Sequence, residues 1–502
     1  MIICDVIATH ARMRPNAPAL IDLDRTQSWT YAELDRSVDR LAAWIVDHLG
    51  PNSGQRIATL TRNCAEMVIL HHAATRGGAI FVPLNWRLAK AEILALLADA
   101  DPMILFHDTD LDPMTDRQTL AVGELLSLGQ NGRVPDPAAR RPFGETACLL
   151  YTSGTSGRPK GVMLSEENFF WGATGYILAN RVAHGSVFLC DMPLFHMAGI
   201  EGAARSIIQA GGTLLVAGAF DPGLTLRRMM DPLLKVSHYF CVPQMAAALW
   251  NHLDFDADRL RTIAGWTVGG APNPKACSER FVTAGICLSE GFGMSETGPN
   301  FSMPAWDFDV LARKVGSCGL PMLGVQARIV DDEDQDVSPG IRGELWVRGP
   351  SVCQGYWNQP ELSAKSFTDD WFRTGDTGML DDEGFLYIVD RKKDMFISGG
   401  ENIYPAEIEA VIAELDEVAE AAVVGVPDER WGEVGRAYVI PVAGRGVTAE
   451  EVIAHCAKRL ARFKVPKTAV ITTVITRTAS GKVQKHLLRE RALGEIVNVD
   501  PE

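Results

Sequence analysis

An eleven-residue stretch at 151–161, with the sequence YTSGTSGRPKG, combines residue types that suit a polyphosphate ligand. Its three glycines let the backbone approach a ligand closely and turn N–H groups toward it. Four hydroxyl side chains between 152 and 156 add donors, and Lys160 adds a positive charge. A Walker loop is excluded, because Pro159 interrupts the pattern and no Gly-Lys-Ser/Thr sequence occurs. An ordinary Gly/Ser surface turn is the alternative, and it fits shorter clusters better.

The flanks of this stretch predict how the phosphates would be held. Apolar runs at 147–150 and 161–164 predict two strands, and Ser165 then begins a helix. We therefore expect a strand–loop–strand hairpin around the phosphates rather than a helix N-terminus.

A second candidate motif, EGFGMSETG at 290–298, offers groups that suit ATP and its metal ion. Phe292 presents a flat face for adenine, Ser295 a hydroxyl, and Glu296 a hard oxygen ligand for Mg²⁺. The motif lacks the third glycine of a dinucleotide fingerprint and does not open a strand–helix–strand unit. Taken alone it is equally well explained as a structural turn.

Together the two motifs resemble the signatures of the adenylate-forming superfamily, which includes acyl-CoA synthetases, luciferases and peptide-synthetase adenylation domains. The resemblance runs from the helix start at 30–33 to Lys482, and so covers nearly the whole chain. The family usually has Tyr-Gly-x-Thr-Glu; Phe292 and Ser295 keep the stacking face and the hydroxyl donor. Thr476 stands where the family usually has a proline, which we expect to loosen the turn and to keep Lys482 in register.

The resemblance implies roles for individual residues. Lys482, His196 and Lys160 are the catalytic candidates, and Glu296 and Thr155 are the candidate metal ligands. Asp376 would accept both ribose hydroxyls, and the CoA nucleotide would meet cations and aromatic faces. The residues implied to bind ATP or CoA are Arg87, Thr152, Ser153, Gly154, Thr155, Ser156, Gly157, Gly270, Ala271, Pro272, Glu290, Gly291, Phe292, Gly293, Met294, Ser295, Asp376, Arg391, Gly399, Gly400, Trp431, Phe463 and Lys467.

The implied activity is that of an ATP-dependent carboxylic acid:CoA ligase, with Mg²⁺ as cofactor. The carboxylate attacks the α-phosphate to give acyl-AMP and pyrophosphate, and the CoA thiol then displaces AMP. A carboxylate of pKa about 4 is already ionised at neutral pH, so no general base is required. The chemistry instead needs positioning and charge neutralisation, by Lys482, Mg²⁺ and the loop donors near Thr155.

His196, in PLFHMAG at 193–199, marks the acid site by the same resemblance, although a lone histidine is more often structural. Peptide-synthetase adenylation domains have an aspartate there for the substrate ammonium, a role that histidine cannot fill, so amino acids are disfavoured. The side chains expected nearby are apolar: Phe170, Phe195, Met197, Cys241, Val242, Met245 and Phe292. This lining indicates a medium- or long-chain fatty acid or an aryl acid, with a fatty acid slightly ahead.

Three other functions stay open at this point. An adenylating enzyme that loads a carrier protein would form no thioester with free CoA, and a luciferase-type oxygenase would consume oxygen. A non-catalytic nucleotide sensor would release no pyrophosphate with any acid.

The elements that must position these residues follow an α/β rhythm. Strands expected near 57–60, 79–83 and 103–106 alternate with helices, and the rhythm returns between 187 and 253. From about 316 short alternating strands with glycine turns begin. The predicted fold is α/β: a large body of two layered α/β subdomains with a small β-barrel-like subdomain, and then a small mobile α+β domain. The boundaries are 1–392 and 393–502, and the resemblance places the pivot at Lys393.

The amino-acid composition limits the kinds of binding partner that we expect. The net charge of −15 argues against nucleic acid, because binding a phosphate backbone requires a basic face. Ten scattered cysteines without metal spacing indicate a reduced, cytoplasmic setting. No signal peptide or spanning apolar run is expected. The expected partners are small molecules, namely the acid, ATP and CoA, and a homodimer stays open.

Overall fold

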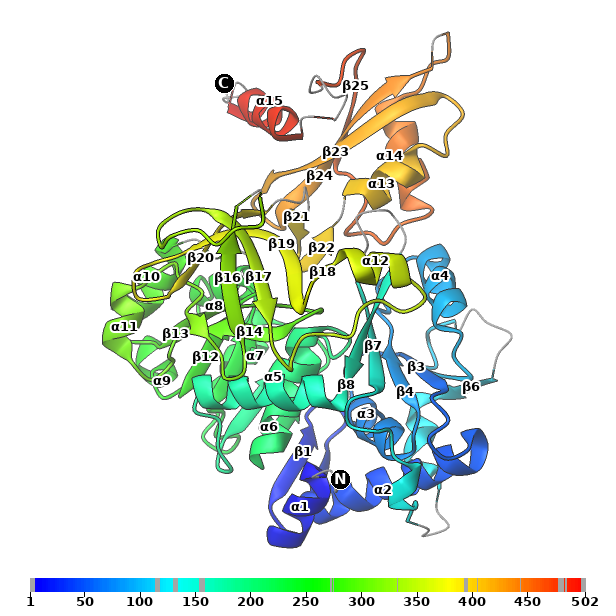
Figure 1. Cartoon of the computed structure of the whole chain (residues 1–502), viewed down its shortest axis with the longest axis vertical. Coiled ribbons are helices and arrows are strands. Elements are labelled where there is room, and N and C mark those ends of the chain that lie inside the picture. Colours follow the sequence, from blue (N-terminus) through cyan, green and yellow to red (C-terminus); the bar gives the residue numbers. More distant parts are fainter. Residues whose placement is uncertain are drawn as a thin grey trace. The chain divides into compact units, whose positions relative to one another are not determined.

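The computed structural model describes residues 5–112, 118–129, 134–152, 159–270, 273, 275–331, 333–391, 396–403, 405–442, 444–476, 483 and 485–497. The chain divides into two compact units (Figure 1). The large unit comprises Met1–Trp86, Asp99–Tyr151 and Gly161–Asp390. The small unit comprises Arg87–Ala98, Thr152–Lys160 and Arg391–Glu502. None of the helices in the described residues is long and apolar enough to cross a membrane.

A nine-stranded sheet forms one half of the large unit, in the order β15-β14-β13-β12-β11-β9-β10-β1-β2. The six strands from β13 to β1 in this order run parallel, whereas β14, β15 and β2 pair antiparallel at the two edges. The strands are β1 Pro18–Asp22, β2 Gln27–Thr30, β9 Val187–Cys190, β10 Thr213–Val216, β11 His238–Cys241, β12 Gly265–Val268, β13 Leu288–Met294, β14 Gly298–Ser302 and β15 Leu320–Pro321.

A six-stranded sheet forms the other half, in the order β6-β5-β3-β4-β7-β8. Its strands are β3 Arg56–Leu60, β4 Ile80–Pro83, β5 Ile104–His107, β6 Gln118–Ala121, β7 Thr146–Thr152 and β8 Lys160–Ser165. One hydrophobic core joins the two sheets, since it includes Ile57 and Phe81 from this sheet and Phe188 and Leu215 from the other. Strands buried on both faces explain why these segments read as apolar runs.

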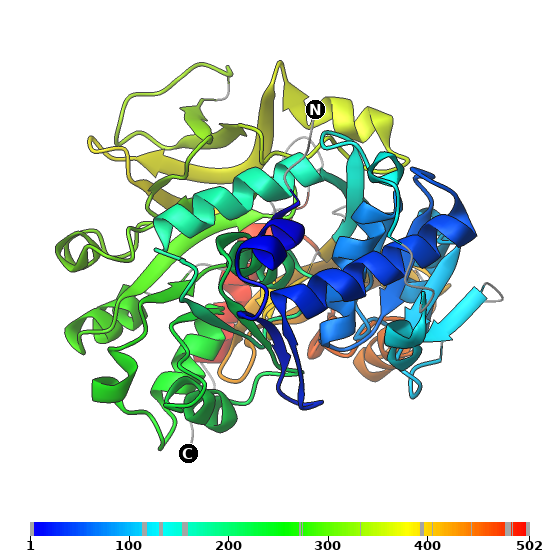
Figure 2. The same cartoon turned by 90° about the horizontal axis from the view of Figure 1, so that it is seen from below.

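Helices cover both sheets. Thr30 opens α2, at the helix start predicted for 30–33, in a capping box with Glu33, and Figure 2 shows α2 as a long blue helix beside α1. The helices of the large unit are α1 Val6–Met13, α2 Tyr31–Leu49, α3 Ala65–Arg76, α5 Glu166–Ala179, α6 Ser206–Ala210, α7 Pro222–Met229, α8 Pro243–Trp250, α9 Ala257–Leu260, α10 Lys275–Thr283, α11 Phe308–Arg313 and α12 Pro360–Lys365, with short η1 Val122–Ser127 and η2 Pro137–Ala139. A π-helix, η3 Ala198–Arg205, precedes α6.

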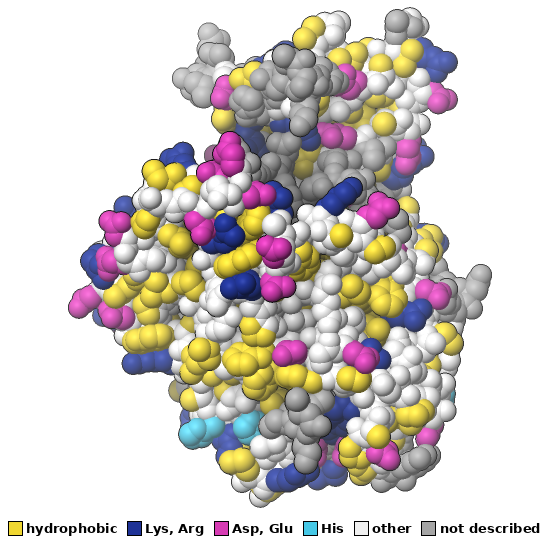
Figure 3. All heavy atoms as spheres, in the orientation of Figure 1, with side chains coloured by type: hydrophobic (Ala, Val, Ile, Leu, Met, Phe, Trp, Pro, Cys, Tyr) yellow, Lys and Arg dark blue, Asp and Glu magenta, His cyan; other side chains and the backbone are white. Residues whose placement is uncertain are grey.

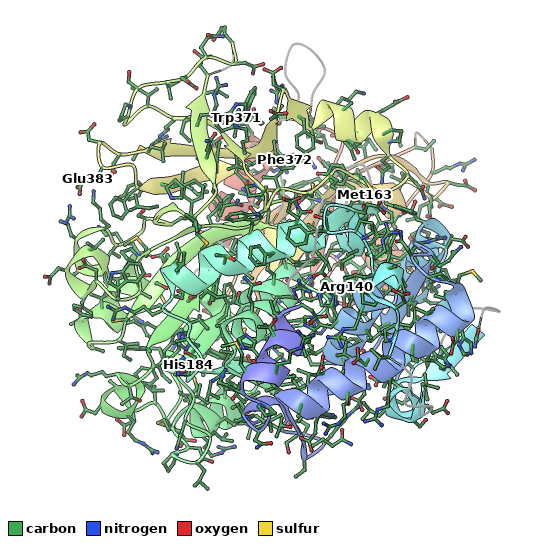
Figure 4. The ribbon with its side chains drawn as sticks, turned by 60° about the horizontal axis from the view of Figure 1, so that its bottom comes forward. Arg140, Met163, His184, Trp371, Phe372 and Glu383 are labelled. Carbon is green, nitrogen blue, oxygen red and sulfur yellow. The ribbon has the colours of Figure 1, made fainter. Side chains whose placement is uncertain are left out.

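The short strands expected after residue 316 form a five-stranded sheet, β16-β17-β19-β18 with β20 beside β19. They are β16 Gln326–Val330, β17 Gly343–Arg348, β18 Phe367–Thr368, β19 Trp371–Leu380 and β20 Leu386–Arg391. Phe372 of β19 is buried, and its neighbour Trp371 is half-buried (Figure 4). Arg348 and Arg328 lie over the Trp371 ring, where Figure 3 shows basic, acidic and apolar side chains interleaved around β16 and β17.

The small unit is an α+β fold around a sheet ordered β22-β21-β24-β23, with β25 beside β24. Its strands are β21 Phe396–Ser398, β22 Glu401–Ile403, β23 Val418–Asp428, β24 Gly432–Pro441 and β25 Thr468–Ile471. Its helices are α13 Pro405–Ile412, α14 Ala449–Ala457 and α15 Lys485–Val497, and most of α4 Lys90–Ala100 belongs to the same unit. Thr448 opens α14 in a capping box with Glu451.

Candidate active site

The stretch at 151–161, which is predicted to bind phosphates, connects two adjacent strands, as the sequence predicted. Strand β7 ends at Thr152, β8 begins at Lys160, and the two are neighbours in the six-stranded sheet. The residues expected to cradle the phosphates, Ser153, Gly154, Thr155, Ser156 and Gly157, lie outside the described residues. Their roles, including Thr155 as a metal ligand, stay predictions.

The exit strand β8 is anchored by its neighbours. Ser165 caps α5 in a capping box with Asn168, whose amide also donates to the carbonyl oxygens of Pro350 and Val352 at 2.9 and 2.8 Å. Met163 of β8 (Figure 4) donates its N–H to the carbonyl of Gly355 at 3.0 Å. A bridge between Val162 and Tyr356 continues this pairing. The segment at 354–357 is therefore paired along β8.

The second motif lies on β13 and the turn after it. Glu290 and Glu296 are buried at the two ends, whereas residues 291–295 between them are half-buried and accessible to a ligand. Ser278 donates to Glu290 at 2.6 Å, and burial raises the pKa of the Glu290 carboxyl. The Phe292 ring meets the Phe301 ring edge-on at 6.2 Å between centroids. One face of Phe292 is thereby fixed by β14.

Glu296 has a tyrosine partner that sequence reasoning missed. The Tyr356 hydroxyl donates to Oε1 of Glu296 at 2.9 Å, and the Cys353 N–H donates to the Glu296 carbonyl at 2.7 Å. Burial and the adjacent carboxylate raise the pKa of Tyr356 well above its usual value, so the phenol stays a neutral donor. The tyrosine therefore fixes one carboxylate oxygen and gives the side chain a defined orientation.

Glu296 also fits the role of a magnesium ligand. Among the described residues no group of three or more histidine, cysteine, aspartate or glutamate side chains could hold a metal ion. A lone carboxylate suits Mg²⁺, which proteins commonly bind through one or two carboxylates together with substrate phosphates. When bound, the ion neutralises phosphate charge.

The Gly-Gly turn lies directly beside the second motif. Strand β12 pairs in parallel with β13, with Val268 opposite Glu290, so Gly269 and Gly270 come next to Gly291. A Cβ at Gly269 would stand 3.0 Å from the Gly291 carbonyl oxygen, and Gly270 has φ of +81°. Both positions therefore require glycine. Ala271 and Pro272, which follow in the predicted adenine segment, lie outside the described residues.

The candidate acid site begins where β9 ends. The Phe195 ring is buried and lies 4.7 Å from the half-buried His196 ring, measured between centroids. Phe240 is the half-buried residue of β11, whose other three side chains are buried. A Cβ built at Gly269 would lie 3.3 Å from the Phe240 ring, and one at Gly202 of η3 would lie 4.0 Å away. Two glycines thus leave space around a flat aromatic surface.

The other predicted lining residues divide into two groups. Met197, Cys241, Val242 and Met245 are buried in the core that contains Phe195. Phe170 lies on α5 beside Phe143 and Trp171, at ring distances of 5.9 and 5.8 Å.

The expected ribose ligands lie on two neighbouring strands of the five-stranded sheet. Asp376 is half-buried on β19, and its N–H donates to the Thr374 hydroxyl at 3.1 Å. Arg391 is the last residue of β20, and its side chain lies outside the description.

In the small unit the structure brings together several residues predicted to bind CoA. The Trp431 ring, 39% exposed, lies against Gly399. Asp428 accepts the Trp431 N–H at 3.0 Å and forms an ion pair with Lys467. Arg87 faces Glu401 at 3.4 Å, and Phe463 is half-buried. Lys482 and Lys393 lie outside the described residues.

A buried charge cluster in the small unit carried no sequence signal. Lys464 is 4% exposed and is paired with Glu92 of α4 and with Glu407 of α13, the latter at 2.6 Å. Burial raises the pKa of Glu407 to about 7, against the attraction of Lys464. For Glu92 burial is outweighed by the hydrogen bond from Glu407 and the Lys464 charge, and its pKa is lowered.

The glycine turn beside β13 and the buried Glu296 after it agree with the family resemblance drawn from the sequence. The family model described as AMP-binding enzyme matches residues 7–357, and the model for the AMP-binding enzyme C-terminal domain matches residues 407–482. The chain therefore belongs to the AMP-binding enzyme family, and the resemblance to the adenylate-forming superfamily is confirmed.

Relatives identify the reaction. The chain is 37% identical to feruloyl-CoA synthase of an Amycolatopsis species over 486 residues, covering 96% of this chain and 97% of the relative. It is 37% identical to indoleacetate–CoA ligase of Aromatoleum aromaticum over 513 residues, with 98% of both covered.

Solved structures support the same reaction. The fold matches o-succinylbenzoate CoA synthetase of Bacillus subtilis bound with a product analogue, at a TM-score of 0.88 and 32% identity over 97% of this chain and 98% of that one. The protein is accordingly an AMP-forming acyl-CoA ligase that uses ATP, Mg²⁺ and CoA.

Proposed function

We propose that the acid activated by this ligase is an aryl carboxylic acid, which reverses the slight sequence-based preference for a fatty acid. The observation that carries the proposal is the half-buried Phe240 ring beside the side-chain-free positions Gly202 and Gly269. A flat ring with open space above it favours a planar ligand, because offset stacking adds to ordinary apolar burial. The relatives named for feruloyl-CoA and indoleacetate support the same class.

The site residues then have distinct roles. In the first step Lys482, Lys160 and the hydroxyls around Thr155 neutralise and orient the phosphates, so that the acid carboxylate can approach the α-phosphate. His196 and Phe195 border the carboxylate end of the acid, and Phe240 faces its ring. In the second step the CoA thiol attacks the acyl carbonyl and AMP leaves. Trp431 and Lys467 hold the CoA nucleotide.

A substrate panel tests the choice of acid. Ferulic, indoleacetic and benzoic acids are compared with octanoic and palmitic acids, by pyrophosphate release and by thioester formation. We expect kcat/KM for the best aryl acid to exceed that for either fatty acid. A higher kcat/KM with a fatty acid contradicts the proposal.

The variant Phe240→Leu isolates the aromatic ring. It keeps an apolar side chain and removes the flat face, so kcat/KM for the aryl acid should fall about tenfold, as the loss of one aromatic pair of about 1.5 kcal/mol implies. Turnover of octanoic acid should change much less. Phe255→Leu is the matched control, because Phe255 is also half-buried in the large unit but packs on Trp250 and Phe281. Equal losses with both acids would show that the Phe240 ring does not face the aryl ring of the acid.

The proposal also includes a cellular compartment and an oligomeric state for this protein. The nine cysteines among the described residues are all free thiols. This supports a reducing setting such as the cytoplasm. A homodimer is the assembly to test by light scattering of the purified chain.

A further inference from the structure

One side-chain amide joins the two sheets of the large unit at the start of the candidate acid site. Asn63 lies between β3 and α3. Its Nδ2 donates to the carbonyl oxygens of Met192 and Ala217, at 2.8 and 3.1 Å. Its Oδ1 accepts the N–H of Leu194 at 2.9 Å. The amide thus uses both of its donors and its acceptor on backbone groups.

These backbone groups lie where the strand ladder ends; besides Asn63, the Met192 carbonyl accepts the Cys190 thiol at 3.5 Å, which is a weaker donor than an amide. Strand β9 ends at Cys190, so Met192 and Leu194 are beyond its ladder, and Pro193 between them has no N–H to offer. Met192 and Leu194 are both buried, where an unpaired backbone group is costly. Ala217 follows β10 and donates its own N–H to Cys190 at 2.9 Å. Asn63 therefore clamps the ends of β9 and β10 together.

The loop that carries Asn63 is itself rigidly held. The Arg62 N–H donates to Asp108 at 2.9 Å, and the Ala65 N–H donates to Asp22 of β1 at 3.0 Å. Backbone positions on both sides of Asn63 are thus fixed by buried carboxylates. The Asn63 amide is therefore fixed relative to the six-stranded sheet. Through its hydrogen bonds it holds the backbone of Met192, Leu194 and Ala217 relative to that sheet.

The clamped segment leads directly to the acid-site residues. Leu194, whose N–H Asn63 binds, is followed by Phe195 and His196, and the His196 N–H closes a turn onto the Pro193 carbonyl at 3.1 Å. The helix η3, with Gly202 facing Phe240, begins two residues later. The direction in which the chain leaves Met192 therefore sets where the Phe195 and His196 rings stand.

We propose that Asn63 is a positioning residue of the acid site: its amide holds residues 192–194 so that Phe195 and His196 border the acid carboxylate. The inference rests on the proposed function for the assignment of that site. Asn63 itself touches no substrate and acts through the loop at 192–194. A displacement of the loop by about 1 Å would cost roughly a hundredfold in kcat/KM for the acid, because the acid would be held less well and its carboxylate would no longer be aligned.

Two variants separate hydrogen bonding from shape. Asn63→Ala removes all three bonds. Asn63→Asp keeps the size and an acceptor for Leu194, but sets a carboxylate against the two carbonyl oxygens of Met192 and Ala217. If the donors matter, Asn63→Asp is as damaging as Asn63→Ala; if only shape matters, it restores wild-type behaviour. Gln209→Ala is the matched control, since the Gln209 amide donates to the Phe170 carbonyl and the Thr174 hydroxyl, away from this loop.

The first measurement requires no substrate. Hydrogen exchange of a peptide covering 191–199 in the full chain reports whether the loop is held. We expect roughly tenfold faster exchange at Leu194 in Asn63→Ala, as the loss of one hydrogen bond of about 1.4 kcal/mol implies. Asn63→Asp keeps the acceptor for the Leu194 N–H, so its effect is expected in the KM for the acid rather than in exchange at Leu194. Wild-type exchange should persist in Gln209→Ala. Unchanged exchange in Asn63→Ala overturns the proposal, whether or not any acid is turned over.

The second measurement is steady-state pyrophosphate release with ferulic acid. We expect KM for the acid to rise at least about tenfold in both variants, with KM for ATP within about twofold of wild type. Equal rises in both KM values, or rescue by Asn63→Asp, overturn the positioning role. A wild-type enzyme inactive on every aryl acid refutes the proposed function instead, and octanoic acid then replaces ferulic acid in the same comparison.

Discussion

The hydrogen bond from Tyr356 orients Glu296, the predicted magnesium ligand. The tyrosine donates to Oε1 at 2.9 Å and stays a neutral donor, since its own pKa is raised. We predict that Tyr356→Phe will raise the Mg²⁺ concentration needed for half-maximal pyrophosphate release and lower the adenylation rate. A hydrogen bond to a charged group contributes about 1.5–3 kcal/mol, or roughly ten- to a hundredfold.

A matched tyrosine controls for lost stability in this experiment. The Tyr176 hydroxyl is also buried and donates to Thr267 at 3.1 Å, a neutral partner. Tyr176→Phe should therefore leave the Mg²⁺ titration unchanged while it lowers Tm by a similar amount. Identical Mg²⁺ curves for Tyr356→Phe and wild type would show that the tyrosine has no part in preparing the site.

Lys482 is the residue on which the sequence prediction depends most, and its position rests on the motif alone. We predict that Lys482→Ala will slow acyl-AMP formation by about 10²–10³, equivalent to roughly 3–4 kcal/mol, because one preorganised charge is lost from an anion-on-anion reaction. Thioester formation from supplied acyl-AMP should be much less affected. Lys458→Ala, at an exposed position on the small unit, is the control. Equal losses in both steps would count against the assignment.

At the scale of elements, local signals predicted most of the architecture. The capping boxes at Thr30, Ser165 and Thr448 begin α2, α5 and α14, because the pattern of Ser or Thr followed by Glu or Asn is sufficient locally. Asn63 and Tyr356 could not be predicted, since their partners lie 129 and 60 residues away in the chain. The π-helix η3 has no sequence signature comparable to a cap. Long-range polar contacts are thus the part that only the structure supplies.

The cluster around Lys464 joins helices α4 and α13 to the turn that carries Lys464, and it should make the stability of the small unit depend on pH. Because the folded-state pKa of Glu407 is raised to about 7 from an ordinary 4.5, folding favours the protonated carboxyl. That contribution is complete below about pH 4.5, falls as the pH rises, and is lost above about pH 7. Glu407→Gln keeps an acceptor for Lys464 without the charge. We predict that its Tm advantage over wild type will grow from pH 5 to pH 8.

Thermal unfolding of the full chain at pH 5, 6, 7 and 8 measures this difference. Glu92, whose pKa is lowered, stays ionised over the whole range and should not contribute to it. Glu429→Gln, at an exposed position of the same unit, provides the control and should shift Tm equally at every pH. A pH-independent difference for Glu407→Gln would mean that Glu407 is not the titrating group.

At the scale of the whole molecule, the two half-reactions need different surroundings for one acyl group. The first needs Lys482 near the α-phosphate, and the second needs an open route for the thiol. The family resemblance implies that the small domain beginning at 393 rotates between the steps, and this stays a prediction.

Lys393, two residues after Arg391, is the predicted pivot, and rotation there requires free backbone torsions. Proline would lock φ near −65° and remove an N–H. We predict that Lys393→Pro will keep acyl-AMP formation within about tenfold of wild type, a barrier change of about 1.4 kcal/mol, because the family resemblance implies a negative φ at the pivot in the adenylating arrangement. Thioester formation should fall far more steeply. Lys393→Ala controls for the lost charge and should leave both steps near wild type. Single-turnover measurement of each step decides the matter, since an unimpaired thioester step in Lys393→Pro would place the pivot elsewhere.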